Sequence, residues 1–161
     1  MNGRFRIRSA SLRQTARKRL QGEHIENDTF HLSADRAHRL NDRRGRTARR
    51  HSGQYATAAK AASPAFSGFS AKRGETLHIS KFTGGKPATP SCTTCHGDSP
   101  RSVGRTPAGK SIEPVAVSVS PARYTDPAKV EKWFRRNCTE VLGRECTPLE
   151  KGDWLTYVIS Q

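Results

Sequence analysis

Two cysteines and a histidine lie close together near the middle of the chain, in the segment Cys92-Thr93-Thr94-Cys95-His96. This C-x-x-C-H spacing is the signature of c-type haem attachment. Two thiols one helical turn apart can reach the two vinyl groups along one edge of a porphyrin, and the histidine that follows then lies under the iron as its proximal ligand. The motif predicts one covalently attached haem c, bound through Cys92 and Cys95 and ligated by His96.

Two other uses of a close cysteine pair fit the sequence less well. A thioredoxin-like redox pair occurs in a βαβ context, and the chain shows no strand pattern. A zinc site would need a second close pair, but seven residues lie between the other two cysteines, Cys138 and Cys146. A disulfide is the simplest assignment for Cys138 and Cys146. Such a disulfide would close the loop between the two cysteines and contribute roughly 2–3 kcal/mol to stability in the chain-entropy account.

The second axial ligand of a haem iron is not evident from the residue types. The only methionine is Met1, and no histidine follows His96. Four residues recur at i, i+3, i+4 and i+7 and share one face of a predicted helix: Val130, Trp133, Phe134 and Asn137. Three of them are bulky and apolar, which suits the cover of a distal haem pocket. Two interpretations of Asn137 stay open on spacing alone: an iron ligand, or a helix-terminal residue that caps its own backbone.

Four helices are expected to position these residues. Their predicted ranges are 54–62, 70–79, 126–137 and 147–159, with start signals at Ser70, Asp126-Pro127 and Thr147-Pro148. His78 lies on the second helix, and we interpret it as a surface or packing residue rather than a ligand. The Gly-, Pro- and Ser-rich connection over 97–124 is long for a structureless loop, so we expect it to wrap around something. No strand pattern competes, and the predicted fold class is all-α.

Residues 1–52 differ in composition from the rest of the chain, whose net charge is +15. They hold 14 Lys and Arg against 5 Asp and Glu, whereas all 9 prolines and all 4 cysteines follow residue 52. We predict an Arg-rich extension over 1–52, either disordered or produced by an incorrectly assigned start, and a cytochrome c domain over 53–161. An arm that binds nucleic acid or an acidic surface is the functional alternative for the extension. No stretch approaches the ~18 apolar residues of a membrane span.

The chain resembles the sphaeroides haem protein group of c-type cytochromes over about residues 54–161. The segments that carry the resemblance are Gly84-Gly85-Lys86-Pro87, Ser91 to Gly97, Arg123-Tyr124-Thr125-Asp126, Val130-Glu131-Lys132-Trp133, Arg136-Asn137-Cys138, Gly143-Arg144, Cys146-Thr147-Pro148 and Glu150-Lys151. It implies a class I cytochrome c fold, Asn137 as the distal ligand and a Cys138–Cys146 disulfide beside it. In that fold the first and last helices cross closely, which gives Gly74 a packing role against Trp154 or Tyr157.

The predicted function is electron transfer by a monohaem protein whose distal site opens on reduction. A neutral amide is a hard, weak donor that suits ferric iron better than ferrous iron. Reduction is therefore expected to release Asn137, so that oxygen, nitric oxide or carbon monoxide can bind. The resemblance also implies transient oxygen binding and a diheme cytochrome c as redox partner, and we expect a carrier rather than an enzyme. The alternative is a basic nucleic-acid-binding protein with a small metal knuckle.

Charge and redox chemistry give further expectations. A basic set on one predicted helix either steers an acidic partner or forms a solvated face: Lys129, Lys132, Arg135 and Arg136. Arg105, Lys110 and Arg123 are candidate partners of the haem propionates.

Covalent haem and a disulfide both indicate an oxidising compartment, the periplasm. The printed sequence shows no apolar run of a secretory signal, so we expect such a signal upstream of the correct start.

Overall fold

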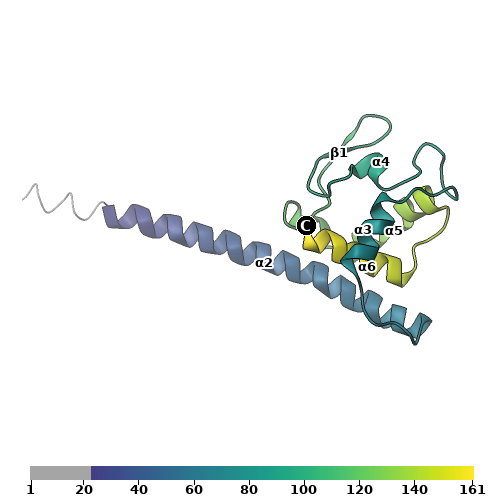
Figure 1. Cartoon of the computed structure of the whole chain (residues 1–161). Helices are drawn as coiled ribbons and strands as arrows, with labels where there is room; N and C mark the ends of the chain where they lie inside the picture. The colour runs from purple at the N-terminus through teal and green to yellow at the C-terminus, as the bar shows by residue number, and fades with distance from the viewer. Residues whose placement is uncertain (1–22) are drawn as a thin grey trace, which may run out of the picture. The chain divides into compact units, whose positions relative to one another are not determined.

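The computed structural model describes residues 23–161, and residues 1–22 of the predicted extension lie outside them. The described part is predominantly helical, as the sequence predicted (Figure 1). Its elements, in chain order, are α2 (Glu23–Ala62), α3 (Ala71–Ile79), α4 (Thr93–His96), β1 (Gly104–Arg105), β2 (Ser111–Ile112), the 3₁₀ helix η1 (Pro121–Tyr124), α5 (Pro127–Leu142) and α6 (Pro148–Ser160).

Side-chain caps fix where three of the helices begin. The Ser70 hydroxyl accepts a hydrogen bond of 3.3 Å from the N–H three residues on, at the start of α3. The Asp126 carboxylate does the same at 3.1 Å for α5. At α6, Thr147 and Glu150 each accept from the other's N–H, at 3.2 and 2.8 Å. All three starts were predicted, because a cap depends on residues within a single turn.

The predicted end of α5 at Asn137 is wrong. The helix continues to Leu142, and Gly143 ends it in the left-handed conformation with φ +72°. Cys138 and Val141, in the added segment, are buried, so tertiary packing extends the helix past the polar residues at 135–137. Asn137 therefore lies inside α5 and does not cap it, which leaves its amide free for another role.

Helices α3 and α6 cross closely, as the resemblance implied for Gly74 (Figure 1). A Cβ on Gly74 would lie 2.6 Å from the carbonyl carbon of Asp153 and 2.8 Å from the Cβ of Tyr157, closer than real Cβ atoms come. Leu155 and Val158 of α6 are fully buried. The crossing therefore needs a residue without a side chain, and the centre of the hydrophobic core lies beside it.

The connection over 97–124 contains a short antiparallel pair in which β1 bonds to β2. Our prediction of no strand misses this pair, because two residues are too few to leave an alternating pattern. A Cβ on Gly104, in β1, would lie 3.0 Å from the Cα of His96. The connection therefore packs directly against the segment that carries the C-x-x-C-H motif.

Helix α2 passes through the boundary predicted after residue 52 without a break. The compact unit that holds every later element begins at Asn41, and within it Ala48, His51 and Tyr55 are buried. Nε2 of His51 lies 2.9 Å from the carbonyl oxygen of Tyr124. Buried residues of this compact unit therefore precede residue 53, the position at which the composition changes.

None of the helices within residues 23–161 combines the length and the apolar character that a membrane crossing requires.

Candidate haem site

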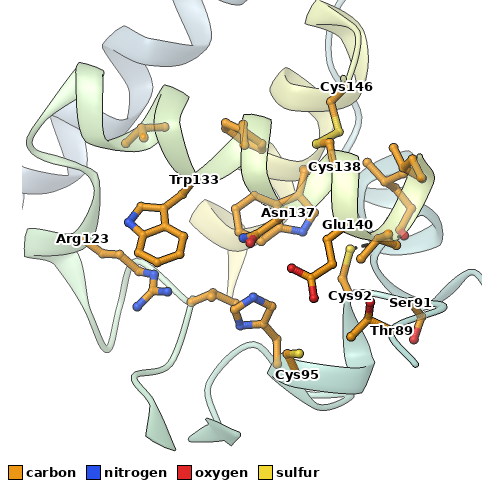
Figure 2. A pocket seen from close by; sticks show the side chains of 18 of the residues that line it. Thr89, Ser91, Cys92, Cys95, Arg123, Trp133, Asn137, Cys138, Glu140 and Cys146 are labelled. Carbon is orange, nitrogen blue, oxygen red and sulfur yellow. Dashed lines mark hydrogen bonds between the residues drawn. A yellow bond between two sulfur atoms is a disulfide. The ribbon is translucent and has the colours of Figure 1, made fainter. Parts of the chain in front are cut away.

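Most of the predicted site residues line a single hollow between α4 and α5 (Figure 2). Its empty volume is about 980 Å³, counting open solvent at the mouth. The predicted residues that line it are Cys92, Cys95, His96, Arg123, Val130, Trp133, Phe134, Asn137, Cys138 and Cys146. Arg105 and Lys110 do not line it. Both are exposed, and the Arg105 guanidinium donates to the carbonyl of Gly109 at 3.0 Å.

The C-x-x-C-H motif forms one wall of the hollow. The N–H of His96 donates to the carbonyl of Cys92 at 3.0 Å, which closes one helical turn. Cys92 and Cys95 are both free thiols, and burial raises the pKa of Cys92 to about 11. Two free thiols on one turn, both lining the same hollow, are the arrangement that attachment to one porphyrin edge requires.

The imidazole of His96 lies in the same hollow and is neutral at physiological pH. Burial lowers its pKa to about 4, with smaller contributions from the charge of Arg123 and from His78. Its Nδ1 is buried and has no hydrogen-bond partner among residues 23–161. A neutral imidazole is the form that ligates a metal. The thiol pair and this ring therefore fit a covalently bound haem.

Helix α5 forms the opposite wall. Figure 2 shows Trp133 and Asn137 pointing from α5 into the hollow. The Phe134 ring packs edge-on against Trp154, with 5.6 Å between centroids. Trp133 is 43% exposed, and the Arg136 guanidinium lies 5.4 Å from its ring centroid, so Trp133 forms part of the rim. Within the described part of the chain, no side chain or backbone group hydrogen-bonds the Asn137 amide.

The part of α5 next to Asn137 is fixed by covalent and backbone contacts. Cys138 and Cys146 form a disulfide whose Cα atoms are 5.5 Å apart. The N–H of Lys86 donates to the carbonyl of Glu140 at 2.7 Å. The backbone that carries Asn137 is therefore held in place, while its amide is left without a protein partner.

Glu140 is a site residue that the sequence did not indicate. Its carboxylate points into the hollow (Figure 2), and its Oε1 lies 3.6 Å from Nζ of Lys86. Glu140 follows Asn137 by three residues and so lies on the same face of α5. The sequence analysis missed it because the predicted helix ended at Asn137. Thr89 also lines the hollow, with a buried Oγ1 that has no partner among the described residues.

Comparison with known proteins leads to one family. Residues 64–158 match the family described as "Domain of unknown function (DUF1924)". The cytochrome c-type protein SHP of Cereibacter sphaeroides is 55% identical over 91 residues, which are 56% of this chain and 70% of that protein. The solved structure of oxidised SHP, an oxygen-binding cytochrome c, aligns with a TM-score of 0.66 and 46% identity over 71% of this chain and 96% of that one. This chain belongs to the SHP family of c-type cytochromes.

A second relative has lower sequence identity to this chain. Cytochrome c'' of Methylophilus methylotrophus is 32% identical over 109 residues, which are 67% of this chain and 76% of that protein. The predicted all-α, class I cytochrome c fold is confirmed by these similarities. The cofactor is accordingly haem c, the group that the free thiols, the neutral imidazole and the hollow suit.

Proposed function

We propose that this SHP-family cytochrome transfers electrons through one haem that Cys92 and Cys95 attach, with His96 and Asn137 as axial ligands. The observation that carries the proposal is that the motif on α4 and the unpartnered amide on α5 line opposite walls of one hollow. When bound, the haem supplies a one-electron redox centre at which diatomic gases can also bind. We expect a carrier rather than an enzyme.

Asn137 is the residue expected to respond to the redox state. Its neutral amide is a hard, weak donor and binds ferric iron more strongly than ferrous iron. Since no described protein group hydrogen-bonds the amide, only the iron would hold it at the axial position. Reduction should release this side chain, so that oxygen, nitric oxide or carbon monoxide can reach the space beside Trp133 and Phe134. SHP is described as an oxygen-binding cytochrome c, which supports this step.

Absorption spectra of the matured protein test the proposal. We expect a pyridine haemochrome spectrum of the c type. Carbon monoxide should change the spectrum of the reduced protein and leave that of the oxidised protein, which serves as the control, unchanged. Protein that shows no Soret band after expression with haem-attachment machinery would contradict haem attachment. A reduced spectrum that does not respond to carbon monoxide would contradict an opening distal site.

Arg123 is the basic residue that we assign to the haem propionates, because it lines the hollow whereas Arg105 and Lys110 do not. Its guanidinium lies 3.4 Å from the carbonyl oxygen of Glu113, a long contact that leaves other donors of the group available.

We place the protein in the periplasm, because thioether-linked haem and the Cys138–Cys146 disulfide both form in oxidising compartments.

We further propose that a basic face on α5 binds the redox partner. It consists of four exposed cations: Lys129, Lys132, Arg135 and Arg136. The Arg136 guanidinium lies against the Trp133 ring, so this basic face adjoins the rim of the hollow. An acidic redox protein, such as a diheme cytochrome c, would be steered by these charges to the place where the haem is closest.

Charge reversal tests the basic face. We expect Lys129→Glu with Lys132→Glu to lower the second-order rate constant for electron transfer with an acidic redox protein about tenfold at low ionic strength, because the steering field is lost. The effect should shrink as salt is added. The control, Lys60→Glu with Lys81→Glu, changes the net charge equally at two other exposed lysines. An equal loss in both double variants would mean that net charge alone sets the rate, and would contradict a docking role for this face.

A further inference from the structure

His78 on α3 is a fully buried histidine that has no part in the proposed function. Its side chain is 0% exposed, and it does not line the hollow. Both ring nitrogens have partners: Nε2 lies 3.0 Å from the carbonyl oxygen of Gly97, and the indole N–H of Trp154 points at Nδ1 over 3.3 Å. We interpreted His78 from the sequence as a surface or packing residue; its burial excludes the surface alternative, and the packing alternative omits two polar contacts.

These two contacts fix the tautomer of the ring. An indole N–H can only donate, so Nδ1 must accept. A carbonyl oxygen can only accept, so Nε2 must carry the proton and donate to Gly97. Geometry alone therefore assigns the neutral Nε2–H form to His78.

The carbonyl that His78 binds belongs to the residue directly after the proximal ligand. Gly97 ends α4 with φ +70°, and its N–H donates to the carbonyl of Thr93 at 2.9 Å. On another side of the same turn, Gly104 packs against the backbone of Cys95 and His96. The His96 backbone is therefore held by α3 through His78 and by β1 through Gly104.

We propose that His78 is a positioning residue that holds His96 on the haem iron through the Gly97 carbonyl. This inference rests on the proposed function, because it takes His96 as the proximal ligand. The Nε2–H of His78 donates to the Gly97 carbonyl at 3.0 Å, so the backbone directly after His96 is tied to α3.

Three variants of the matured haem protein test this role. In His78→Gln the side-chain amide reaches the place of Nε2 and can still donate to Gly97. In His78→Asn the amide reaches only the place of Nδ1, so Trp154 keeps a partner and the Gly97 carbonyl loses one. His78→Leu removes both hydrogen bonds. The Gln and Asn variants differ by one methylene and form a matched pair.

The first readout is the iron–histidine stretching band in the resonance Raman spectrum of the reduced protein. The second is the fraction of the reduced, nitric-oxide-bound protein that is five-coordinate because the proximal histidine has detached. We expect His78→Gln to match the wild type. His78→Asn and His78→Leu should lower the stretching frequency and shift the detachment equilibrium about 10–100-fold, as changes around a ligating histidine typically do. If His78→Leu does not mature, the Gln and Asn pair decides.

The outcomes separate this inference from the proposed function. A reduced wild type that is five-coordinate and still lacks an iron–histidine band would mean that His96 is not the proximal ligand, and both would fail together. A normal wild type with an unchanged band and unchanged coordination in His78→Asn would overturn the positioning role alone, even if the melting temperature falls. A shift in His78→Gln as large as that in His78→Asn would also overturn it, since the hydrogen bond to Gly97 would then not be the cause.

Discussion

Replacing Asn137 by alanine is expected to change the oxidised protein and to leave the reduced protein nearly as it is. The amide would be an iron ligand only in the ferric state, where its oxygen is the better-matched donor. Asn137→Ala should therefore alter the ferric absorption spectrum and spin state, while the reduced spectrum with carbon monoxide stays the same. Because a ligand that stabilises only the ferric state lowers the midpoint potential, the variant should have a higher one, by about 59 mV for each tenfold of binding that is lost.

Thr139→Ala is the matched control for this prediction. Thr139 is exposed, lies two residues further along α5 and does not line the hollow. Thr139→Ala should leave the ferric spectrum, the reduced spectrum with carbon monoxide and the midpoint potential unchanged. A ferric spectrum and spin state of Asn137→Ala that match the wild type would show that the amide is not on the iron. Spectroelectrochemical titration of the three proteins in one buffer makes the comparison.

Helix starts were predictable from the sequence because their causes are local. Ser70, Asp126 and Thr147 each cap a helix through a hydrogen bond to an N–H three residues on. The end of α5 was not predicted, because buried contacts of Cys138 and Val141 extend the helix. The burial of His51 was not predicted for a similar reason: it is polar and stands in an Arg-rich segment, yet it is buried.

The two walls of the haem site differ in how far the sequence determines them. The Cys92–His96 wall is contained in a single helical turn, so its spacing alone indicates its chemistry. The wall that carries Asn137 is 41 residues further along the chain, and spacing left the role of that amide open. The resemblance to a family supplied the assignment, and the fold then removed the capping alternative by placing Asn137 inside α5. The contacts of His78 depend on three separate elements, and no local pattern indicates them.

The close crossing of α3 and α6 leads to the largest expected effect on stability. A Cβ on Gly74 would overlap the backbone carbonyl of Asp153 and lie 2.8 Å from the Cβ of Tyr157. Neither is the flexible end of a side chain, so the helices must move apart. We expect Gly74→Ala to lower the free energy of unfolding by about 3 kcal/mol, at the upper end of the cost of overpacking. Denaturant unfolding of the haem protein, followed by far-UV circular dichroism, measures it.

Gly53→Ala is the control for Gly74→Ala, because Gly53 also lies inside a helix and a Cβ there would meet nothing within 4 Å. Alanine should raise stability at this position by about 0.5–1 kcal/mol, through the lower entropy of the unfolded chain. The same substitution should therefore have opposite signs on α2 and α3. If Gly74→Ala also stabilises the protein, α3 and α6 do not approach as closely as described, and Trp154 of α6 could not then reach His78 of α3.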